Sequence, residues 1–138
     1  MNTAHQRFWA ITGMAAVFAL SGCTSIQLIC SATADIRPEQ LHGFWKVRLG
    51  ATDSHWTLQL GPHPEHRGSM RGELSQGALR YPVVADLDGQ DFTLEESHDG
   101  QRIAATWLGE VVTGSCGQTL RGERIGPQER REAFDMQR

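Results

Sequence analysis

The sequence contains few of the features that catalysis or nucleic-acid binding requires. Lys46 is its only lysine, and the 13 Lys and Arg residues are outnumbered by 16 Asp and Glu, which gives a formal net charge of −3. No basic stripe runs along the chain, so a nucleic-acid partner is not expected. The nucleophile elbow of hydrolases, the phosphate-binding loop and the dinucleotide fingerprint are all missing. We therefore expect a protein that is not an enzyme and uses no cofactor.

The sequence also lacks an apolar run long enough for a permanent transmembrane helix, which needs roughly 20 residues. Its longest run, from Phe8 to Leu20, is interrupted by Thr12 and Gly13 and follows a short polar segment that contains Arg7. This length and order are typical of a cleaved export signal.

The residues that follow the apolar run are Leu20-Ser21-Gly22-Cys23, a pattern that resembles the lipobox of bacterial lipoproteins. The resemblance implies that residues 1–22 are a signal peptide and that Cys23 carries the acyl chains that anchor the mature protein in a lipid bilayer. The next residue, Thr24, is not acidic, which resembles the outer-membrane class. We expect the protein in the outer membrane, facing the periplasm, but the sequence does not indicate the face. The alternative is an ordinary signal peptide that is cut elsewhere, after Ala32 or Ala34.

Cysteine is scarce, and the three that are present then have separate roles. If Cys23 bears lipid, Cys30 and Cys116 remain, and an exported protein meets oxidising conditions in which two cysteines tend to pair. We predict a Cys30–Cys116 disulfide; the alternative is two buried free thiols.

Without the signal peptide, 116 residues remain (138 − 22), which is enough for one domain with one core. We divide them into a lipidated lead-in over 23–40, a β domain over 41–125 and a polar tail over 126–138. The break at Gly126-Pro127 predicts that this tail is a short exposed helix or a frayed end.

Short runs of alternating apolar and polar residues fill the predicted β domain, and this pattern predicts strands with one buried face. Turn residues such as Asp88-Gly89 and Asp99-Gly100 separate the runs and leave no room for crossover helices, so the sheet is expected to be antiparallel. We predict a small eight-stranded up-and-down barrel, with a two-sheet β-sandwich as the alternative. The expected strands are 44–49, 56–60, 70–74, 79–87, 92–95, 103–107, 111–114 and 119–123.

The Gly43-Phe44-Trp45 segment, placed after a possible helical turn at 37–41, resembles the start of calycin-type barrels. These include lipocalins, avidins and small bacterial inhibitors of metalloproteases. The lipocalin resemblance implies that an arginine from the last strand lies across Trp45, and Arg121 or Arg124 is expected in that position. No ligand-binding residue of these families matches this sequence.

Trp45, Trp56 and Trp107 all fall on the apolar faces of their predicted strands. They either fill the barrel or line a ligand cavity, because an eight-stranded barrel is just wide enough to be packed solid or to hold one small ligand. A packed interior is the favoured interpretation.

Two polar clusters are candidates for chemistry, but each has a simpler explanation. His63, Glu65 and His66 offer three zinc ligands without an evident fourth, so no metal site is predicted. The run from Glu95 to Asp99 contains residue types used in acid–base catalysis, but it leads directly into a turn and is interpreted as a solvated hairpin tip.

Two classes of function remain. The first is a membrane-anchored envelope lipoprotein whose non-catalytic barrel either has a structural role or binds a protein or a small hydrophobic ligand through its mouth or surface. The second is a protease inhibitor of the metalloprotease-inhibitor type, in which residues 24–40 would block a protease cleft.

Overall fold

The computed structural model describes residues 30, 35–51 and 54–138. The predicted signal peptide, the lipidation site Cys23 and most of the lead-in lie outside these residues. Among the described residues, no helix has the length and apolar character needed to cross a membrane.

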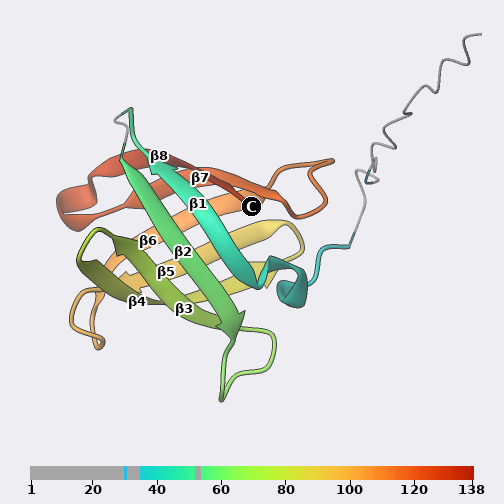
Figure 1. Ribbon diagram of the computed structural model, residues 1–138, viewed down its shortest axis with the longest axis horizontal. Helices are drawn as coiled ribbons and strands as arrows, with labels where there is room; N and C mark the ends of the chain where they lie inside the picture. Colours follow the sequence, from blue (N-terminus) through green and yellow to red (C-terminus); the bar gives the residue numbers. More distant parts are fainter. Residues whose placement is uncertain (1–29, 31–34, 52–53) are drawn as a thin grey trace, which may run out of the picture.

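The chain forms a closed antiparallel barrel of eight strands, each paired with the strands before and after it in sequence (Figure 1). β8 pairs with β1 and closes the barrel. This confirms the predicted fold class. A short 3-10 helix, η1 (Pro38–Leu41), precedes the barrel, and a second one, η2 (Pro127–Glu129), lies between the last two strands. The strands are β1 (Gly43–Leu49), β2 (His55–Pro62), β3 (Met70–Gln76), β4 (Leu79–Asp88), β5 (Asp91–Ser97), β6 (Ile103–Val111), β7 (Thr119–Ile125) and β8 (Arg131–Gln137).

The predicted number of strands is correct, but two of the assignments are wrong. β6 is one strand that contains both 103–107 and 111, which were predicted as parts of two separate strands. Residues 112–114 lie in the connection that follows β6. The eighth strand is Arg131–Gln137, inside the segment predicted to be a helix or a frayed tail. Phe134 and Met136 explain the difference, because they are buried inside the barrel and make this charged segment part of the core.

Apolar side chains at alternate strand positions fill most of the barrel. Every strand contributes to one continuous core, which extends from Ile36 to Met136 in the part of the chain that the structure describes. A domain of residues 24–138 therefore contains all eight strands, both 3-10 helices and every core residue among the described residues. The buried apolar residues are Ile36, Leu41, Trp45, Val47, Leu58, Leu60, Met70, Leu74, Val83, Ala85, Phe92, Leu94, Ala105, Trp107, Val111, Leu120, Phe134 and Met136.

One end of the barrel is closed by η1 and the lead-in residues next to it. Leu41 is completely buried and Ile36 nearly so. The indole Nε1 of Trp45 donates a hydrogen bond of 2.9 Å to the Leu41 carbonyl oxygen. We call this the closed end; η1 marks it in Figure 1.

Arg138 is the arginine that lies across Trp45, with its guanidinium carbon 5.5 Å from the ring centre. It also donates hydrogen bonds to the carbonyl oxygens of Gln40 and His42. The prediction of Arg121 or Arg124 was wrong because β7 was taken as the last strand, whereas Arg138 follows the true last strand, β8.

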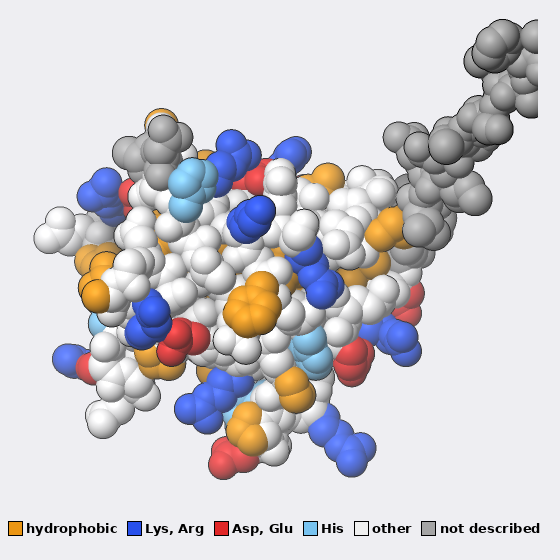
Figure 2. Space-filling view, viewed as in Figure 1, with side chains coloured by type: hydrophobic (Ala, Val, Ile, Leu, Met, Phe, Trp, Pro, Cys, Tyr) orange, Lys and Arg blue, Asp and Glu red, His pale blue; other side chains and the backbone are white. Residues whose placement is uncertain are grey.

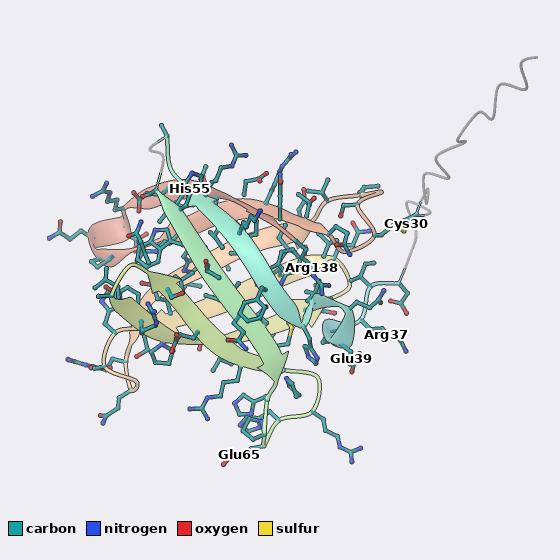
Figure 3. The ribbon with its side chains drawn as sticks, viewed as in Figure 1. Cys30, Arg37, Glu39, His55, Glu65 and Arg138 are labelled. Carbon is teal, nitrogen blue, oxygen red and sulfur yellow. A yellow bond between two sulfur atoms is a disulfide. The ribbon has the colours of Figure 1, made fainter. Side chains whose placement is uncertain are left out.

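The Cys30–Cys116 disulfide predicted from the sequence is present, with 5.3 Å between the two Cα atoms. Cys116 lies in the connection between β6 and β7, which is at the closed end, and Figure 3 shows Cys30 beyond η1 at the same end. The disulfide therefore fixes the start of the described chain to the closed end.

Candidate functional site

The opposite end of the barrel is open and contains a cavity of about 250 Å³. The described connections 77–78, 98–102 and 126–130 surround this open end, and His55 marks it in Figure 3, far from Arg138 at the closed end. The lining is mostly apolar and aromatic, with two carboxylates and one guanidinium among it. It consists of Leu49, Trp56, Leu74, Leu79, Tyr81, Glu96, His98, Trp107, Arg124 and Glu132.

Glu96 lies at the bottom of the cavity and is only 1% exposed. Strand alternation places it there, because Phe92 and Leu94 face inward from β5 and Glu96 is the next inward position. It is the only buried polar or charged residue in the part of the chain that the structure describes. A buried carboxylate is costly unless it is paired and hydrogen-bonded, so its surroundings must supply donors.

Four donors meet the two carboxylate oxygens of Glu96. Arg124 binds in bidentate fashion, with Nε 2.9 Å from Oε2 and Nη2 2.9 Å from Oε1. The indole Nε1 of Trp107 donates to Oε2 at 2.9 Å. The imidazole Nε2 of His98 lies 2.7 Å from Oε1. Each oxygen thus has two partners, which uses the acceptor capacity of the group.

These contacts set the charges at the bottom of the cavity. Burial alone raises the pKa of Glu96, but hydrogen bonds from Arg124, His98 and Trp107 outweigh it and hold that pKa below its ordinary value. The same hydrogen bonds from Arg124 raise the pKa of its guanidinium. Glu96 and Arg124 therefore form a charged pair at neutral pH.

Arg124 also connects Glu96 to the edge of the cavity. Its guanidinium lies over the Trp107 ring, 5.7 Å from the ring centre, and its Nη1 is 3.4 Å from Oε2 of Glu132. The second oxygen of Glu132 pairs with the exposed Arg130 at 3.2 Å. Arg121, the other arginine predicted to stack on a tryptophan, instead points outward and pairs with Asp135 at 2.9 Å.

Three stacked rings form one wall of the cavity, which we call the aromatic wall: Trp56, Tyr81 and His98. The ring centres of Trp56 and Tyr81 are 5.9 Å apart, and those of Tyr81 and His98 are 4.1 Å apart. Because the imidazole of His98 also contacts Glu96, the wall is continuous with the charged pair at the bottom.

The three predicted tryptophans have different positions. Trp45 is packed at the closed end, and Trp107 is fully buried beneath the cavity and touches it. Trp56 is partly buried and lines the cavity. The interior is therefore packed around Trp45, while the open end leaves space beside Trp56 and Trp107.

The predicted polar clusters have separate outcomes. The His63 ring accepts hydrogen bonds from the backbone N–H groups of Glu65 and His66, so one of its nitrogens stabilises the β2–β3 connection. No group of three or more metal-ligating side chains occurs within the described residues. The interpretation of 95–99 as a solvated hairpin tip is correct for Asp99, whose side chain accepts hydrogen bonds from the backbone N–H groups of Gln101 and Arg102. It is wrong for Glu96, which is buried.

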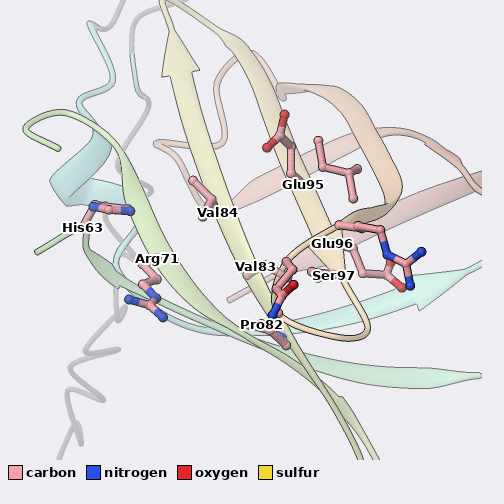
Figure 4. A pocket seen from close by; sticks show the side chains of 12 residues that line it. His63, Arg71, Pro82, Val83, Val84, Glu95, Glu96 and Ser97 are labelled. Carbon is pink, nitrogen blue, oxygen red and sulfur yellow. The ribbon is translucent and has the colours of Figure 1, made fainter. Parts of the chain in front are cut away.

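A second hollow of about 190 Å³ lies on the outer surface of β3, β4 and β5, and Figure 4 shows it with Arg71 and Glu95 at its sides. Most of its side chains are exposed. Figure 2 shows that hydrophobic groups on the visible face are scattered among charged ones, without a broad apolar patch. The cavity at the open end is therefore the stronger candidate site.

Comparison with known proteins adds no relative: no protein-family model matches the chain, and no curated protein is significantly similar to it.

Proposed function

We propose that the protein is a lipid-anchored envelope protein whose barrel binds a small, largely apolar, ring-containing molecule at its open end, without catalysing a reaction on it. The observation that supports this best is the 250 Å³ cavity between the aromatic wall and the Glu96–Arg124 pair. Small-molecule sites commonly combine an apolar, aromatic lining with a few well-placed polar groups.

The size of the cavity favours a molecule of one or two rings. An apolar cavity of about 150 Å³ is enough to bind benzene, so a cavity of about 250 Å³ suits a somewhat larger ring system. A long acyl chain is not favoured, because packed side chains around Trp45 and Leu41 occupy the closed end.

The position of the disulfide supports an orientation relative to the membrane. Cys23 precedes Cys30 by seven residues, a distance that a fully extended chain spans in at most about 25 Å. Because Cys30 is bonded to Cys116 at the closed end, we propose that this end faces the bilayer. The open end would then face the aqueous compartment, where a ligand could enter.

Calorimetric titration of the soluble domain, residues 24–138, with 2-naphthylmethanol tests the binding site. We expect saturable binding at one site, and we expect Leu49→Trp to weaken it at least about tenfold, because the larger side chain fills the opening. Phe44→Trp, on the outer face of the same strand, is the matched control and should bind as the unmodified domain does. Equal binding by the Leu49→Trp variant would show that the ligand lies elsewhere.

The anchor is tested separately by mass spectrometry of the mature protein and by cell fractionation. We expect an acylated amino-terminal Cys23 and membrane association that Cys23→Ser abolishes. A mature chain that starts within 31–35 and carries no lipid would contradict the proposed anchor.

A further inference from the structure

We infer that the ligand of the open-end cavity is a cation, an amine or ammonium group carried on an apolar ring. The inference depends on the proposed function and adds the charge of the ligand to it. It follows from the charges of the lining, from the acceptor capacity of Glu132 and from the faces of the aromatic wall.

The charged groups of the lining are unequal in number. Two carboxylates, Glu96 and Glu132, face one guanidinium, Arg124. Arg130 reaches Glu132 from the rim, but it is 75% exposed, and such exposed pairs contribute little. The lining therefore contains one more carboxylate than guanidinium, which favours a positively charged ligand.

Glu132 is the group with acceptor capacity to spare. Among the described residues, each of its two oxygens has one partner, at 3.4 Å from Arg124 and 3.2 Å from Arg130, whereas a carboxylate offers about four lone-pair sites. Glu96, in contrast, has two donors on each oxygen. An ammonium group in the cavity would therefore bind at Glu132, whose side chain is 24% exposed.

The aromatic wall supports the same ligand class. Trp56 lines the cavity, and a cation within about 6 Å of its ring centre would be attracted by the negative face of the ring. The Tyr81 ring, in contrast, stacks on both Trp56 and His98. An anionic ligand would lack this attraction and would meet two carboxylates, while the guanidinium of Arg124 is already held by Glu96.

Three probes of matched shape test the inference on the soluble domain: 2-naphthylmethylamine, 2-naphthylmethanol and 2-naphthoate, which are cationic, neutral and anionic at pH 7. Calorimetry should show the amine binding about tenfold more tightly than the alcohol, a difference of roughly 1.4 kcal/mol, because both probes can donate to the Glu132 carboxylate but only the ammonium adds a charge–charge attraction. The carboxylate should bind most weakly.

Glu132→Gln should reduce the preference for the amine over the alcohol to about twofold or less. Glu123→Gln, a carboxylate on the outer face of β7 that pairs with Arg131, should keep the full preference. Should the Glu132→Gln domain fail to fold, the ranking of the three probes on the unmodified domain remains a complete test of ligand charge.

The possible failures are distinguishable. Alcohol binding that equals or exceeds amine binding would overturn the cationic ligand and leave the binding cavity standing. A full amine preference in a folded Glu132→Gln variant would overturn the role of Glu132. Absence of binding by all three probes at millimolar concentration would overturn the proposed function and this inference together.

Discussion

Glu96→Gln is the substitution that tests the charged pair beneath the cavity most severely. Glutamine has nearly the same shape, so the change creates no void, but its single carbonyl oxygen can accept at most two of the four hydrogen bonds that Glu96 receives. Its NH₂ group would face donors from Arg124. The guanidinium of Arg124, only 14% exposed, would then keep a charge without its main partner.

The magnitude follows from the burial of both groups. Removing one partner of a buried ion pair costs about 3–5 kcal/mol, a large part of the roughly 5–15 kcal/mol that stabilises a typical domain. At about 4 °C per kcal/mol for a domain of roughly 100 residues, Tm should fall by about 12–20 °C. Thermal and urea unfolding followed by circular dichroism measure both quantities.

Glu95→Gln is the matched control, because Glu95 is the preceding residue on the same strand and is exposed on the outer face. It should change the free energy of unfolding by no more than about 0.5 kcal/mol. The Glu96→Gln/Arg124→Gln double variant should lose less than the sum of its two single variants, because it leaves no unpaired buried charge. A Glu96→Gln domain as stable as the Glu95→Gln domain would refute this reasoning.

Three further predictions concern stability. Reduction of the Cys30–Cys116 disulfide should lower the free energy of unfolding by about 2–4 kcal/mol, which urea unfolding with and without reductant measures. Labelling of both thiols in the unreduced protein would show that the disulfide does not form. Because the folded-state pKa of Glu96 lies below its ordinary value of 4.5, the stability that ionised Glu96 contributes is complete above pH 4.5 and is lost as the pH falls through the folded-state pKa. Glu96→Gln should therefore flatten the curve of Tm against pH in this acidic range, and a curve of unchanged shape would contradict the contribution of Glu96. Arg138→Ala should lower stability by roughly 1–2 kcal/mol through loss of the contact with Trp45 and of two hydrogen bonds, whereas an unchanged Tm would show that Arg138 contributes nothing to closing the barrel.

Local sequence signals were enough to predict most of the barrel. Alternation of side chains predicted seven of the strands at least in part, and Asp88-Gly89 marked a turn that the structure contains, with Gly89 at a φ of +62°. β8 was missed because three of its seven residues are charged and only Phe134 and Met136 are buried apolar groups. Without partners, such a segment resembles a solvated tail.

The charged pair at the bottom of the cavity could be predicted only in part. Continuing the inward positions of Phe92 and Leu94 along β5 leads to Glu96, so its inward direction was visible in the sequence. Its burial depends on Arg124, 28 residues later on another strand, and no local pattern indicates that pairing. The position of Arg138 was hidden for the same reason, because it depends on β8 closing the barrel.

The central claim is that a small ring-containing molecule occupies the open end of the barrel, and the indole N–H signals of the soluble domain test it most directly. That domain contains Trp45, Trp56 and Trp107. Titration with 2-naphthylmethanol in a ¹⁵N NMR experiment should shift the signals of Trp56 and Trp107 saturably, because both residues touch the cavity. The signal of Trp45, which donates to Leu41 at the closed end, should not move. Movement of the Trp45 signal alone, or of none of the three, would contradict the proposed site.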